Sequence, residues 1–100
     1  MAERMRLAKE RLRSAAETGL RLRSYEVALD LDLSEFHFAR MFRAAFDCSP
    51  RSYYNEVRAA RARTLLAGGM DESEVAQLLG FRRPGELRSL LLKRSAKNGE

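Results

Sequence analysis

Two stretches of the sequence are near copies of each other: EVALDLDL at residues 26–33 and EVAQLLGF at residues 74–81. Each begins with the same tripeptide early in a predicted short helix, and each reaches a turn residue four positions after its alanine. The turn residue is Asp32 in the first copy and Gly80 in the second, and an apolar residue follows it. A short helix, a left-handed turn, an apolar residue and a second helix are typical of a helix-turn-helix, so the sequence predicts two such units.

The helix after each turn carries a matching apolar pair. If the second turn is one residue longer than the first, Phe38 corresponds to Leu87 and Phe42 to Leu91. Residues four positions apart lie on one face of a helix, so each pair is expected to pack into a core. A single match would be weak evidence for a helix-turn-helix, because turns between helices are common in any helical bundle. Two matches in one chain are much stronger evidence.

Proline, glycine and capping residues divide the rest of the chain into helical lengths, and no stretch alternates with the period of two that strands show. We therefore expect an all-α fold with two helix-turn-helix subdomains joined by a long linker helix. The expected N-caps are Ser24, Ser34, Ser49 and Asp71. The helices are predicted over residues 2–17, 25–31, 35–46, 50–67, 72–79 and 84–94.

The chain is expected to form a single domain. Its predicted parts are a first subdomain over about residues 1–48, a linker helix over 49–68, a second subdomain over 69–94 and a frayed polar tail over 95–100. Helical spacing predicts a buried stripe on the first helix made of Met5, Ala8, Leu12, Ala15 and Ala16. The stripe predicted on the linker helix consists of Tyr53, Tyr54, Val57, Ala60 or Arg61, Thr64 and Leu65.

Composition argues against several classes of protein. The chain has 100 residues, enough for one modest core but not for a core and a deep ligand cavity. Cys48 is the only cysteine and His37 the only histidine, so we expect no internal disulfide, no metal site, no cofactor and no enzyme activity. No apolar run reaches membrane-spanning length and the N-terminus does not resemble a signal peptide, which predicts a cytoplasmic protein without a membrane contact.

The chain is basic, with 19 lysines and arginines against 14 acidic residues. Most of the basic residues are arginines, whose planar fork suits phosphate and guanine. A net charge of +5 is also common on soluble proteins, so charge alone leaves nucleic acid and an ordinary solvated surface as alternatives. A linker helix over residues 50–67 would span about 27 Å, near the roughly 34–36 Å that separates successive major-groove faces of DNA.

Four motifs connect the chain to a known family. They are LSxxxFxRMFR at residues 33–43, SPxxY at 49–53, RxxRAxxLL at 58–66 and EVAxxLGF at 74–81. Together they resemble the DNA-binding domain of the AraC/XylS family of bacterial transcription regulators, and the resemblance covers about residues 22–93. It implies six to seven helices, with two helix-turn-helix subdomains bound to adjacent major-groove segments of double-stranded DNA.

The resemblance also implies that such a protein activates promoters by contacting RNA polymerase. Because 100 residues leave no room for a sensor domain, we expect a stand-alone regulator that acts as a monomer or weak dimer. The alternative is the excised DNA-binding half of a longer regulator.

The first unit offers six candidates for contact with DNA. They are Glu35, Phe36, His37, Ala39, Arg40 and Arg43. The family's base-reading positions map onto Phe36, Ala39 and Arg40, and we expect Arg40 to contact guanine unless it forms a salt bridge to a neighbouring helix. Phe36 is expected either on the exposed face against a thymine methyl or in the core, and His37 either on a phosphate or as an ordinary surface residue.

The second unit offers five candidates, of which all but the first map onto base-facing positions of the family. They are Arg82, Arg83, Glu86, Arg88 and Ser89. Residues 81–97 contain six basic residues and one acidic residue, a concentration that favours phosphate contact. Arg83 stands at the predicted N-cap, where a cation opposes the helix dipole, which suggests a functional role. We expect the first unit to supply most base specificity and the second to add largely non-specific phosphate affinity.

The chain departs from the family pattern at several positions. Asp32 and Asp47 stand where the family usually has glycine, and Glu72 where an apolar residue packs. Leu87 and Leu91 replace the usual aromatic residues, and a final GxxPxxYR segment is absent. We therefore expect the second unit to be less securely packed.

These departures leave a second function open. Asp30 and Glu86 add acidic charge near the expected DNA face, beside the two aspartates of the turns. The alternative is a degenerate helix-turn-helix interaction module that binds another regulator or RNA polymerase rather than DNA.

Overall fold

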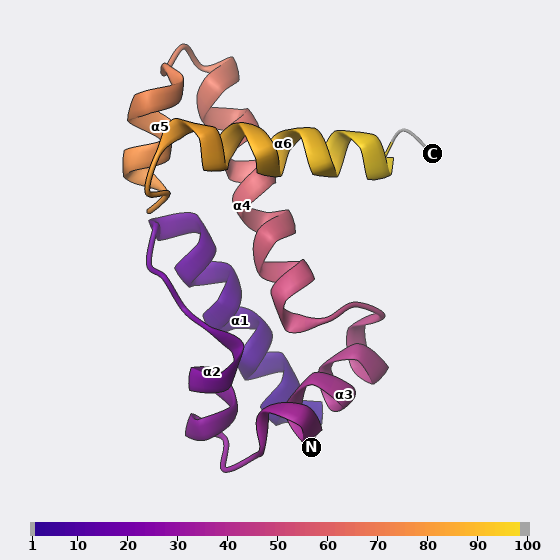
Figure 1. Cartoon of the computed structure of the whole chain (residues 1–100). Helices are drawn as coiled ribbons and strands as arrows, with labels where there is room; N and C mark the ends of the chain where they lie inside the picture. Colours follow the sequence, from indigo (N-terminus) through magenta and orange to yellow (C-terminus); the bar gives the residue numbers. More distant parts are fainter. Residues whose placement is uncertain (1, 99–100) are drawn as a thin grey trace.

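The computed structural model describes the backbone of residues 2–98 and the side chains of residues 2–93. Within this range the chain forms six α-helices and no strand, as predicted (Figure 1). The helices are α1 (Ala2–Thr18), α2 (Ser24–Asp30), α3 (Glu35–Phe46), α4 (Pro50–Ala67), α5 (Glu72–Leu78) and α6 (Pro84–Asn98). None of these helices combines the length and the apolar character that a membrane-spanning segment needs.

The predicted N-caps are confirmed in three of four helices. The side chains of Ser34, Ser49 and Asp71 each accept a hydrogen bond from a backbone N–H three residues later, over 3.0, 3.1 and 2.8 Å. The prediction for Ser24 is wrong, because Ser24 is already helical and Arg23 occupies the N-cap position. The Glu26 carboxylate explains the shift, since it accepts the backbone N–H of Arg23 over 3.3 Å and closes the helix start one residue earlier.

The two predicted turns have the same construction. Asp32 and Gly80 both adopt the left-handed conformation, with φ of 58° and 77°. The next residue then donates its backbone N–H back to the helix: Leu33 to the Ala28 carbonyl over 2.9 Å, and Phe81 to the Ala76 carbonyl over 2.8 Å. The duplicated sequence is therefore a duplicated helix-turn-helix, and α6 begins one residue later in its unit than α3 does.

The last helix is longer than predicted. It continues to Asn98, whereas the sequence suggested an end near residue 94 and a frayed tail after it. No proline or glycine interrupts residues 86–98, so the backbone has no reason to leave the helix before Gly99. The rest of the predicted tail, residues 99–100, lies outside the described residues.

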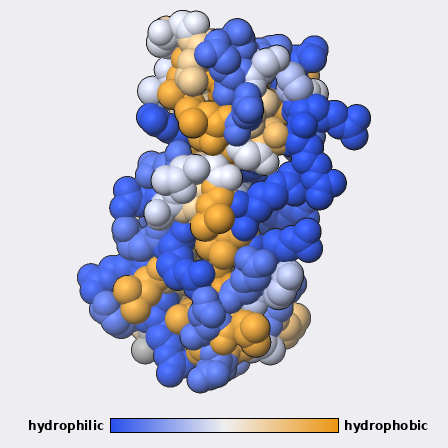
Figure 2. All heavy atoms as spheres, turned by 90° about the vertical axis from the view of Figure 1, so that its left-hand side faces the viewer, coloured by the Kyte–Doolittle hydropathy of each residue, from blue (hydrophilic) through white to orange (hydrophobic). Residues whose placement is uncertain are grey.

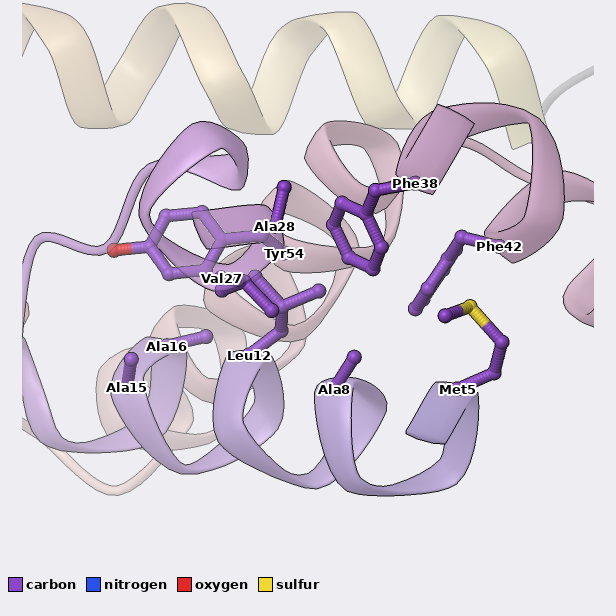
Figure 3. Close-up of a cluster of buried hydrophobic side chains, with 10 residues drawn as sticks. All are labelled: Met5, Ala8, Leu12, Ala15, Ala16, Val27, Ala28, Phe38, Phe42 and Tyr54. Carbon is purple, nitrogen blue, oxygen red and sulfur yellow. The ribbon is translucent and has the colours of Figure 1, made fainter. Parts of the chain in front are cut away.

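Each subdomain has a hydrophobic core of its own. The first core contains the whole predicted stripe of α1, which faces buried residues of α2, α3 and α4 (Figure 3). Its members are Met5, Ala8, Leu12, Ala15, Ala16, Val27, Ala28, Phe38, Phe42 and Tyr54. The second core is smaller and consists of Ala62, Val75, Ala76, Leu79, Phe81 and Leu87. The Val-Ala pair of the first copy is thus buried in the first core, and that of the second copy in the second core.

The long helix α4 connects the two cores, and its buried stripe differs from the prediction. Tyr54 lies in the first core and Ala62 in the second, while Ala59 is fully buried between them. Ala60, Arg61 and Thr64, predicted to be inside, are exposed. The buried side changes along the helix because α1 and α3 cover its first half, whereas α5 and α6 cover its second half (Figure 1).

Candidate nucleic-acid interface

The α3 candidates lie on one outer face of the helix. Phe38 and Phe42 point inward and are fully buried, and their rings contact edge to face with centroids 5.8 Å apart. With these two rings fixing the rotation of α3, five candidates are exposed and Ala39 is half-buried. The exposed candidates are Glu35, Phe36, His37, Arg40 and Arg43.

Arg40 and Phe36 form a pair on this face. The ring of Phe36 is 72% exposed, so its alternative placement in the core is ruled out. The guanidinium carbon of Arg40 lies 5.7 Å from the centroid of that ring, a distance at which a cation is attracted to an aromatic face. Arg40 has no ion pair within the described part of the chain, so the expected alternative of a salt bridge to another helix is not found.

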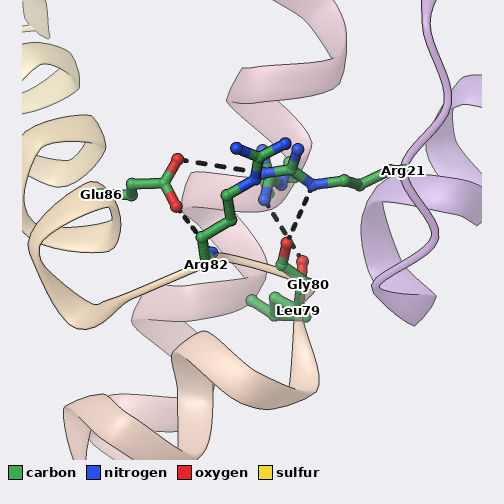
Figure 4. Close-up of polar contacts among 6 residues, drawn as sticks. Arg21, Leu79, Gly80, Arg82 and Glu86 are labelled. Carbon is green, nitrogen blue, oxygen red and sulfur yellow. Dashed lines mark hydrogen bonds and ion pairs between the residues drawn. The ribbon is translucent and has the colours of Figure 1, made fainter.

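The start of α6 is organised by Glu86. One carboxylate oxygen accepts the backbone N–H of Arg82 over 2.6 Å, and the other lies 3.9 Å from the guanidinium of Arg21 (Figure 4). A carboxylate in the first turn also stabilises the positive end of the helix. Both carboxylate oxygens of Glu86 therefore already have partners within the chain. A side chain that is free to contact a base would lack such partners.

The other exposed α6 candidates point in different directions. Arg83 and Ser89 line a hollow beside α4, together with Arg51 and Asn55. Arg88 lies elsewhere, because its Nε is 3.5 Å from the carboxylate of Glu72 on α5. Both partners of this ion pair are exposed. Glu72, which stands where the family has an apolar packing residue, is therefore paired at the surface and not buried. The structure thus groups Arg83, Glu86 and Ser89, and separates Arg88 from them.

A hollow between the two helix-turn-helix units collects arginines that sequence reasoning did not select. The starts of α3 and α6 reach it, through Glu35 and Glu86. We call it the arginine hollow and define its basic residues as Arg21, Arg23, Arg51 and Arg58. The signal on α4 is a polar spacing of four and three residues from Arg51 through Asn55 to Arg58, which places all three on one helix face.

The family match covers most of both units, while Arg21 and Arg23 of the arginine hollow lie before it. A family model described as a helix-turn-helix domain matches residues 27–95, more than two thirds of the chain. The chain belongs to the AraC/XylS-type helix-turn-helix family. Neither the search of curated proteins nor the search of solved structures returned a match.

The AraC/XylS-type match begins inside α2, so α1 lies outside it. The structure nevertheless makes α1 part of the domain, because α1 supplies five of the ten residues of the first core. Three of its four arginines form ion pairs, Arg6 with Glu3, Arg13 with Glu10 and Arg11 with Asp30 of α2. The charged face of α1 is thus partly neutralised within this AraC/XylS-type domain.

Arg58 is partly buried, unlike the other arginines of the AraC/XylS-type domain whose side chains the structure describes. Its guanidinium stacks on the ring of Phe81 at 3.8 Å and donates to the Leu79 carbonyl over 3.3 Å. Burial lowers the pKa of this guanidinium from its ordinary value, although arginine stays charged at neutral pH.

Among the described residues no three histidine, cysteine or acidic side chains are grouped as a metal site would require.

Proposed function

We propose that this protein is a sequence-specific DNA-binding transcription regulator that places α3 and α6 in adjacent segments of the major groove. The observation that carries the proposal is the duplicated turn, after which each unit presents an exposed polar helix start beside one arginine hollow. The molecule extends 41 Å along its longest axis, which suffices to span the roughly 34–36 Å between successive groove faces.

The two recognition helices have different tasks in this proposal. Arg40 of α3 reads a guanine, and Phe36 both orients Arg40 and contacts a neighbouring base edge. On α6 the carboxylate of Glu86 and the guanidinium of Arg88 are held by Arg21 and Glu72, which favours backbone contact over base reading there. The first unit therefore supplies most of the base specificity, while the second reads a weaker half-site and adds largely non-specific phosphate affinity.

The arginine hollow holds the DNA backbone between the two groove segments. Arg23 and Arg51 make no ion pair within the described residues, so their charges are available to phosphates. Arg51 lies in the first turn of α4, where a cation opposes the helix dipole. A bound phosphate would remove this local disadvantage.

The proposal includes the expected partners and place of action. Both reading helices belong to one chain, so a monomer or weak dimer suffices for binding. Contact with RNA polymerase, implied by the resemblance, is the proposed route to activation, and the bacterial cytoplasm is the expected location.

The acidic residues around the interface support a second candidate function. Glu35 and Glu86 both line the arginine hollow, where they would repel a phosphate backbone. A mixed-charge hollow of this kind also fits a protein partner, such as another regulator or RNA polymerase. Asp30 no longer supports this alternative, because it is paired with Arg11 on the α1 side.

Selection of bound duplexes from a random DNA pool tests the proposed function. We expect enrichment of two short motifs about one helical turn, or roughly 10–10.5 base pairs, apart. The affinity for the selected duplex should then fall with salt, with a log–log slope near −0.9 per neutralised phosphate. An absence of binding to any duplex at low salt would contradict the proposal and favour the interaction module.

A further inference from the structure

The two helix-turn-helix units meet at a second place besides α4. The segment after α1 touches the turn that ends α5, and we call this contact the junction. Its members are Gly19, Leu20, Arg21, Tyr54, Arg58, Leu79 and Gly80. The two hydrophobic cores share no buried residue among those described, so the junction adds to α4 a direct contact between the units.

Two glycines allow the backbones to meet at the junction. A Cβ atom on Gly19 would lie 2.2 Å from the Leu78 carbonyl oxygen, and one on Gly80 would lie 2.3 Å from the Gly19 carbonyl oxygen. Real Cβ atoms do not approach other atoms so closely, so neither position accepts a side chain in this arrangement. Both glycines also have positive φ, 81° and 77°, which strains any other residue.

Polar contacts hold the same segments from both sides. The Tyr54 hydroxyl of α4 donates to the Leu20 carbonyl over 2.7 Å, and Arg21 Nε donates to the Gly80 carbonyl over 3.3 Å (Figure 4). Arg58 of α4 donates to the Leu79 carbonyl over 3.3 Å. The loop after α1 and the turn after α5 are thus both attached to α4 and to each other.

The position of the junction matters for α6. The turn that Gly19 and Arg21 contact is the turn of the second unit, and it leads directly into the first turn of α6. Arg21 also lies 3.9 Å from Glu86 in that first turn. On the other side, α1 packs against α3 through the first core. The junction therefore links the placement of α6 to that of α3.

We propose that the junction fixes the distance and angle between the two recognition helices, and so determines which spacing of half-sites in DNA the protein accepts. The inference rests on the proposed function. The residues of the junction are positioning residues, because they act through α6 rather than by touching a base. With α4 as the only connection, bending and twisting of one helix would let α6 follow half-sites at several spacings.

The chain offers a matched pair of variants to test this role. Gly19→Ala adds a Cβ that collides with the other unit, whereas Gly69→Ala adds one at φ 105° with nothing within 4 Å. Both changes strain a left-handed backbone, but only the first opens the junction. Tyr54→Phe is a milder second variant that removes the hydrogen bond to Leu20 and keeps the ring, with Tyr53→Phe on the same helix as its control.

The first measurement is the affinity for duplexes in which the selected half-sites are moved apart by one base pair, which turns the second site by about 34°. We expect wild type and Gly69→Ala to lose affinity about tenfold or more. Gly19→Ala should lose less than about threefold, and Tyr54→Phe an intermediate amount, while binding to a duplex with the first half-site alone stays unchanged. If the circular dichroism of Gly19→Ala shows that it does not fold, the test is decided by comparing the spacing penalty of Tyr54→Phe with that of Tyr53→Phe.

The second measurement needs no DNA. Spin labels at Ala44→Cys on α3 and Leu92→Cys on α6, both exposed positions, report the distance between the recognition helices in a Cys48→Ser background. We expect a narrow distribution in wild type and Gly69→Ala and a broader one in Gly19→Ala. Equal spacing penalties and equal distance distributions in all variants would overturn the role of the junction and leave DNA binding intact. A wild type with a narrow distribution that binds no duplex would instead overturn the proposed function.

Discussion

At the scale of single residues, two exposed arginines illustrate how the surroundings decide what a side chain is free to do. Arg40 lies over the ring of Phe36 and has no acidic partner within the described residues, while Arg88 is paired with Glu72. An exposed ion pair contributes little to stability, but this one holds the Arg88 guanidinium toward α5 through its Nε. Arg40 is therefore the better prepared of the two for reading a base.

Replacing these two arginines separates base reading from backbone contact. We expect Arg40→Ala to lose about 1–3 kcal/mol of discrimination at one base pair, because a bidentate contact to guanine disappears. Arg88→Ala should weaken binding to all sequences alike. The measurement is affinity across a panel of single-base operator variants. A larger loss of specificity in Arg88→Ala would show that the assignment of the two helices is reversed.

Helical periodicity predicted the α3 residues well but could not find the hollow. Phe38 and Phe42 are four positions apart and fix one inward face, which predicts an outward position for Arg40, whereas the sequence leaves Phe36 open between the outer face and the core. Arg21, Arg23 and Arg51 come from two different segments and meet only in the tertiary structure. No local pattern contains that information.

At the scale of secondary-structure elements, two aspartates do the work usually done by glycine. Asp32 after α2 and Asp47 after α3 have φ of 58° and 62°, in the left-handed region. Asp47 also donates its backbone N–H to the Arg43 carbonyl over 2.8 Å, which closes the last turn of α3. Aspartate tolerates this conformation better than most residues, so the turns are retained at some cost in strain.

Asp47→Gly is expected to stabilise the protein by up to about 1 kcal/mol, because glycine adopts a positive φ without a steric penalty. Asp47→Ala should destabilise it by about 1 kcal/mol, because alanine has the penalty and lacks a polar group that could bond to the backbone. Urea denaturation of both variants and of wild type gives the two free energies of unfolding. If Asp47→Gly is less stable than wild type, the carboxylate contributes more to the turn than the relief of left-handed strain does.

Three of the four helix starts with an expected N-cap were predicted correctly. Ser34, Ser49 and Asp71 cap their helices as expected. The error at Ser24 has a local cause, because Glu26 moves the N-cap to Arg23. The error in the second half of α4 does not, because its buried side depends on where α6 crosses it. Ala59 and Ala62 are buried there because small residues permit close approach of the neighbouring helices.

At the scale of the whole molecule, charge is distributed so that one face stays available to an anion. Three of the four arginines of α1 are paired, with Glu3, Glu10 and Asp30. Seen from the side of α2 and α5, the surface is mostly hydrophilic with separate hydrophobic patches (Figure 2). The unpaired basic residues Arg23 and Arg51 line the arginine hollow instead, between the two recognition helices.

The salt dependence of DNA binding should reveal which arginines touch the backbone. We expect Arg51→Ala to reduce the log–log slope by about 0.9, the loss of one neutralised phosphate. Arg63→Ala is the matched control, because Arg63 is exposed on the same helix and lies outside the arginine hollow. Titrations at several salt concentrations give both slopes. Equal changes in the two variants would mean that the hollow has no special place in the complex.

The separation of the two hydrophobic cores has a consequence for how such a regulator can change over evolutionary time. No buried side chain belongs to both cores, so a substitution inside one unit does not require compensation in the other. Under the proposed function, substitutions on α3 can change the bases that the protein reads while α6 and the arginine hollow still hold the DNA backbone. A changed target sequence can then be reached through single substitutions, each of which leaves a protein that still binds DNA.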